Sequence, residues 1–301
     1  MSEGPETPLL LAVPNVSEGR DAAMVERLSR AFSVGATLLD THTDAIHNRS
    51  VFTLAAESVQ EALTSGAREI LEAIDIARHE GEHPRIGVLD VAPVVYLSAE
   101  TKDRAREQAL SAAKQIAELE IPVFLYGELA SIPERRERAY FRSGGLTSLR
   151  ARMESGELQP DLGPKTPHPT AGATLVTARP PLAAFNMEFE GMTITQARAV
   201  AAALRESGGG RTGVRALALA LPGDVTQIST NVHDPIAIPL SEVVERAREL
   251  AEPHAGEIRA AEIVGLVPQG ALDGFPPSVP IPGFDAATGV IENRLAGLSH
   301  D

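Results

Sequence analysis

The stretch SVQEALTSGAREILEAIDIARHEGEHPRIGVLDVAPVVYL, residues 58–97, decides the fold. Its first half repeats apolar residues at helical spacing, which predicts an amphipathic helix over residues 58–77, with Ser58 as N-cap and a glutamate three residues later. Glycine and Pro84 stop the helix, and the apolar run 87–97 predicts a buried strand. A helix, a polar loop and a buried strand form one half of a β-α-β-β-α-β unit.

The residues before this stretch supply the other half of the unit. Apolar runs and helical spacing alternate there, and the pattern predicts a strand at 9–13, a helix at 22–33, and strands at 37–41 and 51–55. A further helix and strand follow the unit, at 102–118 and 123–126.

The second half of the chain repeats this order. It predicts a strand at 183–189, a helix at 193–207 with Thr193 and Gln196 as a capping box, a hairpin of strands 214–221 and 225–232, a helix at 240–254 and a strand at 262–267. The open alternative is chance, because unrelated chains of alternating helices and strands often look alike.

We therefore expect an α/β (α+β) protein with two ferredoxin-like βαββαβ subdomains, residues 1–178 and 179–301, whose mixed or antiparallel sheets face a cleft. The Pro-rich stretch 143–179 separates the two repeats and favours neither helix nor central strand. It is either a loose linker or an ordered loop that crosses the cleft. Residues 274–301 are expected to form a surface loop.

Composition excludes several classes of protein. The 301 residues carry 27 Lys and Arg against 41 Asp and Glu, a net charge of -14, which disfavours nucleic acid and anionic membranes as partners. The absence of cysteine removes thiolate catalysis, disulfides and Cys-ligated metals, and fits a reducing, cytoplasmic location. The first residues lack a signal peptide pattern, and no apolar run is long enough for a membrane span.

Residues His79 to His83 match the H-E-x-x-H pattern of zinc hydrolases. That chemistry needs both histidines one turn apart on an unbroken helix. Gly81 lies between them and Pro84 follows at once, so we expect no metal here, with a zinc hydrolase kept as an alternative.

The same segment fits a catalytic loop better. His83 is able to act as acid or base near neutral pH, Glu82 to set its pKa or tautomer, and Arg85 to grip a carboxylate. The competing interpretation is an ordinary surface histidine.

Other polar clusters stand at predicted strand ends. Each is open to a structural interpretation, as a turn or a helix cap, beside a binding role. The candidates are Asn15, Ser17, Glu18 and Arg20 after the first strand; His42, His47, Asn48 and Arg49 around the second turn; and Asn186, Thr230 and Asn231 in the second half.

Taken together, these segments resemble the formiminotransferase family. The stretches that carry the resemblance are VPNVSEGR at 13–20, HNRSVFTL at 47–54, IDIARHEGEHPRIGVLDVAP at 74–93, VFLYGELA at 123–130, PDLGPKTPHPTAGAT at 160–174, AFNM at 184–187, QISTNVHD at 227–234 and GLVP at 265–268. They occur in the family's order and span nearly the whole chain.

The resemblance implies a homodimeric enzyme that moves a formimino group from N-formimino-L-glutamate to tetrahydrofolate, its co-substrate, in histidine catabolism. The family's catalytic histidine corresponds to His83. Its folate-binding stretch corresponds to Gly163, Pro164, Lys165, Thr166, Pro167, His168, Pro169, Thr170, Ala171 and Gly172. Two departures stand out: His42 replaces an aspartate of the vertebrate enzymes, and PTAG replaces PSWG, so Ala171 lacks an aromatic ring for the pterin. The fused cyclodeaminase is missing, so a separate protein would release ammonia.

The chemistry requires one proton to leave N5 of the folate and one to reach the glutamate nitrogen. We hypothesise that His83 moves both, tuned by Glu82 or Asp90, with no covalent intermediate. Arg20, Arg49 and Arg85 are the candidates for the substrate carboxylates. A non-catalytic folate-binding protein is the third alternative.

Overall fold

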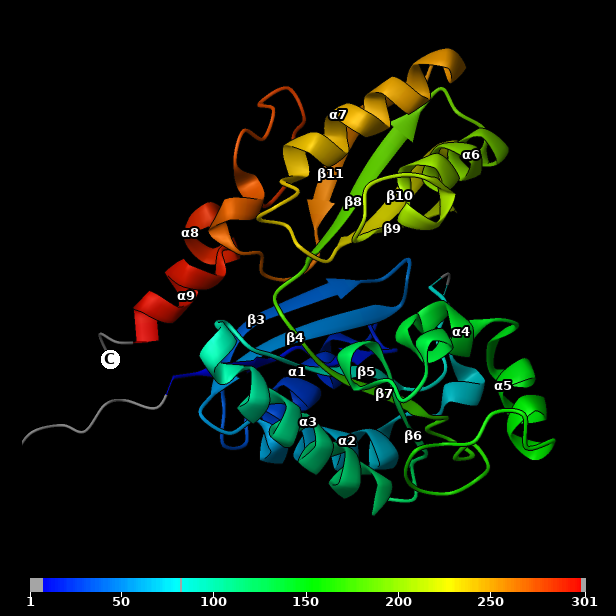
Figure 1. Ribbon diagram of the computed structural model, residues 1–301, viewed down its shortest axis with the longest axis vertical. Helices are drawn as coiled ribbons and strands as arrows, with labels where there is room; N and C mark the ends of the chain where they lie inside the picture. The colour runs from blue at the N-terminus through cyan, green and yellow to red at the C-terminus, as the bar shows by residue number, and fades with distance from the viewer. Residues whose placement is uncertain (1–7, 82, 299–301) are drawn as a thin grey trace, which may run out of the picture. The chain divides into compact units, whose positions relative to one another are not determined.

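The computed structural model describes residues 8–81 and 83–298. The chain divides into two compact units, Met1–Pro180 (unit 1) and Pro181–Asp301 (unit 2). Each unit combines one sheet with packed helices, so the protein belongs to the α+β class (Figure 1). Glu82, a predicted site residue, lies outside the described residues.

Unit 1 holds a mixed sheet whose neighbouring strands are β3, β4, the pair β1 and β2, β5, β7 and β6. β1 and β2 are successive pieces of one line, since both pair antiparallel with β4 and β5. β5, β7 and β6 run parallel. The bounds are β1 Leu10–Ala12, β2 Asn15–Val16, β3 Thr37–Asp44, β4 Arg49–Ala56, β5 Leu89–Val95, β6 Val123–Leu125 and β7 Thr174–Arg179.

Helices cover the two faces of this sheet unequally. α1 (Ala22–Phe32), α2 (Gln60–Ala73) and α3 (Lys102–Ala117) pack on one face and share the larger apolar core with it (Figure 1). The short helices α4 (Arg138–Arg142) and α5 (Gly145–Glu154) build a smaller core with β5, β6 and β7.

The face opposite α1, α2 and α3 is called the site face below. On β4, Phe52 and Leu54 point into the larger core. Because strand side chains alternate between faces, Arg49, Val51 and Thr53 point to the site face. This face therefore receives the Arg49 side chain from the family-like segment 47–54.

Unit 2 repeats the β-α-β-β-α-β order with an antiparallel sheet, in which the strands lie in the order β11, β8, β10, β9. α6 and α7 share one core with it (Figure 1). The bounds are β8 Ala183–Glu190, α6 Ile194–Leu204, β9 Val214–Leu221, β10 Val225–Val232, α7 Leu240–Ala251, β11 Glu257–Ile263, α8 Ala286–Gly289 and α9 Ile291–Leu298. The predicted capping box of Thr193 and Gln196 is confirmed.

Four local predictions were wrong. The N-cap of α2 is Val59, because the Ser58 hydroxyl donates to Gln108 on α3, 2.9 Å away. The stretch 143–179 contains α5 and β7 around its prolines, and 274–301 contains α8 and α9. The last strand of unit 2 lies at Glu257–Ile263, so it begins before the predicted strand 262–267 and overlaps only its first two residues. No helix in the described part of the chain combines the length and apolar character that a membrane span needs.

Candidate active site

Three family-like segments of unit 1 interlock at the site face. The Asn48 side chain accepts from the Gly19 amide at 2.9 Å and donates to the Glu80 carbonyl at 2.9 Å. Asn48 itself has a positive φ of 47°, a conformation that asparagine tolerates better than most residues. One side chain thus ties the 15–20, 44–50 and 79–85 loops together.

Glycines let these loops approach closely. A Cβ at Gly81 would lie 2.4 Å from the His47 carbonyl oxygen, and one at Gly19 would lie 2.5 Å from the Asp44 carbonyl oxygen. Both glycines are therefore required by backbone contact between loops.

Arg85 holds the loop that carries His83. Its guanidinium donates to the carbonyls of Gly81 at 2.9 Å, His83 at 3.2 Å and His79 at 2.9 Å. The His79 ring Nε2 lies 2.8 Å from the Asn48 carbonyl, so this nitrogen carries a proton. Both Arg85 amino groups donate to the loop itself, which makes Arg85 a positioning residue in this structure.

The H-E-x-x-H pattern does not lie on a helix. Residues 76–78 form a single 3-10 turn, and His79 after it is already extended, with φ -78° and ψ 128°. The helical geometry that the zinc pattern requires is therefore not formed. The described residues contain no group of three or more His, Asp or Glu side chains arranged to hold a metal ion.

Asp90 is the buried hub of the site. It is fully buried, accepts from Arg49 at 2.9 Å, and also forms an ion pair with Arg142. Its other oxygen accepts from the Ile86 amide at 2.9 Å. Burial alone would raise the pKa of Asp90, but Arg142 and Arg49 outweigh it and hold that pKa below its usual range.

Three arginines that were not predicted from the sequence continue from this hub. Arg49 and Arg142 both lie within electrostatic reach of Arg138 on α4. Arg49 also donates to the Asn15 side chain at 3.0 Å. Arg138 in turn lies within reach of Arg179 at the end of β7. Burial lowers the pKa of Arg142 and of Arg179 to about 10, values at which both remain cationic at neutral pH. These four residues are called the arginine row.

His83 stands beside this row. Burial, followed by Arg49, Arg142, Arg138 and His47, lowers the pKa of His83 well below its usual value, so the ring is neutral at pH 7. The ring centroids of His47 and His83 are 6.2 Å apart. The Nδ1 of His83 is buried and has no hydrogen-bond partner among the described residues. No hydrogen bond to a described residue therefore occupies this nitrogen.

The remaining candidates of the first segments mainly shape the loops. Ser17 donates to the Gly87 carbonyl at 2.9 Å, and Glu18 accepts from the amides of Arg20 and Asp21 at 2.8 and 3.0 Å. The exposed Arg20 donates to the Ala45 carbonyl at 2.8 Å.

The histidine-rich turn stands on the same face of the sheet. His42 is paired with Val51 in the register of β3 and β4. His47 lies 3.7 Å from Asp44, whose carboxylate also accepts from the Ile46 and His47 amides at 2.7 and 2.9 Å.

The Pro-rich segment 160–172 is an ordered part of unit 1. Its end is fixed beside the His83 loop, since the Thr170 carbonyl accepts from Ile76 at 2.7 Å and the Ala171 carbonyl from Val88 at 2.9 Å. His168 Nδ1 accepts from the Ala171 amide at 3.1 Å. Ala171 is only 2% exposed, so its side chain packs in the core.

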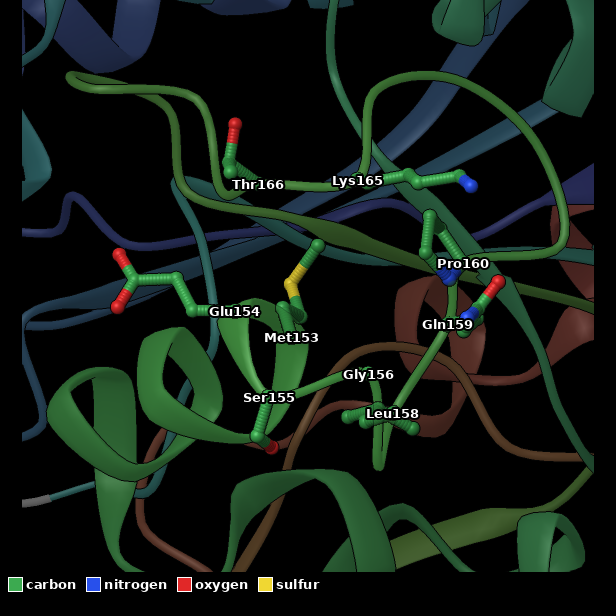
Figure 2. A pocket seen from close by; sticks show the side chains of 9 residues that line it. All are labelled: Met153, Glu154, Ser155, Gly156, Leu158, Gln159, Pro160, Lys165 and Thr166. Atoms are coloured by element: carbon green, nitrogen blue, oxygen red, sulfur yellow. The ribbon is translucent and has the colours of Figure 1, made fainter.

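The middle of that segment faces a pocket of about 360 Å³. Figure 2 shows Lys165 and Thr166 on a loop that passes over the end of α5. The lining residues are Met153, Glu154, Ser155, Gly156, Leu158, Gln159, Pro160, Lys165 and Thr166. Gly163, with a φ of 83°, precedes Lys165 by two residues. Pro164, Pro167, Pro169 and Gly172 complete the segment 163–172.

Three candidates belong to unit 2. Asn186 on β8 donates to Glu262 on β11 at 2.8 Å, and the buried Thr230 hydroxyl donates to the Phe185 carbonyl at 2.6 Å. Asn231 is paired with Ala184 in the register of β10 and β8. Asn186 and Thr230 thus have bonding roles inside the sheet.

Comparison with known proteins shows which family the sequence matches. Residues 9–179 match the family model of the formiminotransferase domain, N-terminal subdomain. The glutamate formimidoyltransferase of Streptococcus pyogenes serotype M1 is 36% identical over 95% of this chain and 98% of its own length. That of Thermoplasma acidophilum is 35% identical over 88% of this chain and 89% of its own length. The formimidoyltransferase-cyclodeaminase of Rattus norvegicus is 36% identical over 88% of this chain, which corresponds to 51% of the longer protein.

These matches cover both units and every segment that builds the site in unit 1. The chain belongs to the formiminotransferase family.

Proposed function

We propose that this protein is a glutamate formimidoyltransferase that moves the formimino group of N-formimino-L-glutamate to N5 of tetrahydrofolate, with His83 as the proton-transfer residue. It is a one-carbon transferase of the family described above. The observation that carries the proposal is a neutral imidazole with an unpartnered ring nitrogen beside a row of arginines. This combination suits proton transfer between anionic substrates.

The reaction asks little of the protein beyond position and proton transfer. N5 attacks the amidine carbon, the bond from that carbon to the glutamate nitrogen breaks, and no protein nucleophile is required. His83 accepts the proton that N5 loses and donates a proton to the departing nitrogen. Protons and bonds then balance across the step.

The electrostatics of the site support both roles of His83. A neutral imidazole at pH 7 is ready to accept a proton, because burial and the neighbouring arginines disfavour its charged form. The imidazolium formed in the reaction is for the same reason a strong acid, which favours donation to the leaving nitrogen. Holding two substrates in contact is expected to contribute about 7–11 kcal/mol toward lowering the barrier.

The folate is assigned to residues 163–172. The end of this segment is hydrogen-bonded beside the strand that follows the His83 loop, and its exposed residues Lys165 and Thr166 line a pocket. Ala171 contributes its backbone only, because its side chain is buried. Asp90 is assigned an indirect role, through Arg49 and Arg142.

Several further properties are part of the proposal. We assign the reaction to histidine catabolism in the cytoplasm, the enzyme to a homodimer, and ammonia release to a separate cyclodeaminase. Asn186, Thr230 and Asn231 are retained as substrate-side residues of unit 2. The name of the rat relative joins a formimidoyltransferase and a cyclodeaminase, which supports a link between the two activities.

The test is a spectroscopic assay of 5-formiminotetrahydrofolate with purified wild type and H83A. General acid–base catalysis predicts a loss of about 10²- to 10⁴-fold in H83A with folding intact. H254A, which removes a histidine of unit 2, is the control and is expected to keep wild-type turnover.

Three results would contradict the proposal. Wild-type turnover by H83A would remove the histidine from the mechanism. Hydrolysis of the formimino donor without 5-formiminotetrahydrofolate, abolished by a chelator and restored by zinc, would favour the hydrolase alternative. Folate binding without turnover in the wild type would leave a binding protein.

A further inference from the structure

Among the described residues, the carboxylates bonded to the arginine row do not balance its positive charge. Arg49, Arg138, Arg142 and Arg179 lie within electrostatic reach along the row, and Asp90 is the carboxylate bonded to it. Both bonds to Asp90 come from one end, Arg49 and Arg142. Arg49 and Arg142 are nearly buried and share Asp90, whereas Arg138 and Arg179 are half-buried and form no ion pair with a described carboxylate. This local excess of positive charge suits an anionic ligand.

Two members of the row have donors left over. The Arg142 side chain is only 10% exposed, and its Nε is buried with no acceptor among the described residues. Arg138 makes neither an ion pair nor a hydrogen bond with any described residue. The two side chains share one helix, four residues apart, and therefore lie on the same face of α4. They are placed to act on one ligand.

The distribution of charge in the two substrates decides which one the row fits. In the formimino donor, the α-carboxylate is attached to the carbon that bears the reacting nitrogen, and the side-chain carboxylate follows two carbons later. In the folate, an aminobenzoyl ring separates N5 from every carboxylate. Only the donor places two carboxylates close to the proton-transfer residue.

We propose that Arg142 binds the α-carboxylate of the formimino donor and Arg138 binds its side-chain carboxylate, so that this pair sets the specificity for a dicarboxylate. The inference rests on the proposed function. The order of the pair follows from position: Arg142 is bonded to the Asp90 hub beside His83, and Arg138 lies one turn farther along the row toward Arg179.

The pair also explains how an acidic protein selects an acidic substrate. The chain as a whole carries a net charge of -14 and repels anions. Guanidinium groups close to the reacting atoms offset this field locally, and each is able to form two parallel hydrogen bonds with a carboxylate.

The test compares R138Q with R150Q. Arg150 is an exposed residue of the neighbouring helix α5, so R150Q removes the same charge without touching the row. R138Q is expected to raise the KM for N-formimino-L-glutamate about 10- to 100-fold, as loss of charged hydrogen bonds does. The KM for tetrahydrofolate should stay near the wild-type value, and R138K should recover part of the loss.

A donor with one carboxylate isolates the contact. N-formiminoglycine has only the α-carboxylate, so R138Q should use it as well as the wild type does. R142Q should impair both donors. Calorimetric titration of wild type and R138Q with N-formimino-L-glutamate measures the same contact without turnover.

The outcomes separate this inference from the proposed function. Active wild type with equal donor KM in R138Q and R150Q overturns the assignment of Arg138 alone. If R138Q instead raised the KM for tetrahydrofolate, the arginine row would bind the folate, and the assignment of Arg138 to the donor would be overturned. Equal loss with both donors in R138Q would contradict the side-chain carboxylate contact. Wild type that neither binds nor converts the donor overturns both proposals.

Discussion

Asp90 shows how one residue supports the charge of the whole site. Its carboxylate is buried on every side and is bonded to guanidinium groups from β4 and α4, which are far apart in sequence. The sequence motif predicts Glu82 or Asp90 as the residue that tunes His83. In the structure Asp90 is paired with Arg49 and Arg142, and burial together with the charges of these two arginines lowers the pKa of His83. The residue is therefore a structural anchor for the cations.

Removal of Asp90 should be costly for folding. D90A leaves Arg49 and Arg142 buried without their counter-charge, and breaking a buried pair in this way typically destabilises a protein by about 3–5 kcal/mol. Urea unfolding followed by circular dichroism measures the change in the free energy of unfolding. D273A, at an exposed aspartate of unit 2, serves as control. Coincident unfolding curves for D90A and D273A would show that the buried pair contributes nothing.

The pH dependence of activity follows from the environment of His83. Only the neutral ring accepts a proton, so kcat/KM falls as the pH drops through the pKa of His83, which lies well below 6.5. The acid limb of the profile should therefore lie below pH 6.5, with Arg49, Arg142, Arg138 and His47 as the groups that hold it there. R138Q removes one of these cations and should move the limb to higher pH. A limb that stays in place or moves to lower pH in R138Q would contradict the electrostatic account.

At the scale of elements, α1 and α2 illustrate how a glycine sets a packing distance. Gly66 lies in α2, where a Cβ would come within 2.0 Å of the Phe32 ring of α1. G66A should destabilise unit 1 by about 1–3 kcal/mol through overpacking, as measured by thermal unfolding. In G297A the new Cβ in α9 meets nothing within 4 Å, so no such loss is expected. Equal melting temperatures of wild type and G66A would mean that the two helices separate at no cost.

Most elements could be predicted from the sequence because their patterns are local. The hairpin strands 214–221 and 225–232 flank a Pro-Gly-Asp turn, and the structure has them at the predicted bounds. The start of α2 could not be predicted, because the Ser58 hydroxyl bonds to a residue 50 positions away. The Pro-rich composition of 143–179 hid α5 and β7, since the prolines are confined to its middle.

The candidate site shows the same division. The His83 loop and Arg49 lie in sequence motifs and were found from them. Arg138 and Arg142 are two of several arginines in a charged stretch, and nothing local separates them from solvent-exposed neighbours. Their spacing of four residues on a short helix was the one available signal. Only the tertiary contact of Arg142 with Asp90, 52 positions away, reveals their place in the site.

At the scale of the molecule, the chain uses one pattern twice for different purposes. When the four strands of the β-α-β-β-α-β run are numbered along the chain, they lie side by side in the order 4, 1, 3, 2 in both units. Unit 1 adds α3, β6 and β7 beyond its last strand, and with them α4 and the Pro-rich segment. The residues of the arginine row and the His83 loop all belong to this extended unit. The additions to the repeated pattern therefore complete the site.

The two units should fold independently. Each has its own apolar core, and the core of unit 2 shares no residue with the two cores of unit 1. Chains of about 120 to 180 residues are long enough to bury a stable core. Fragments 1–180 and 181–301 are therefore expected to give cooperative urea transitions when expressed alone. Circular dichroism at several wavelengths checks that the transitions coincide.

Because the arginine row lies within residues 1–180, calorimetry should detect binding of N-formimino-L-glutamate to that fragment and not to 181–301. A fragment 1–180 that unfolds without a cooperative transition would show that unit 1 depends on the rest of the chain for its fold. A folded fragment 1–180 that does not bind the donor would show that unit 2 supplies part of the donor site.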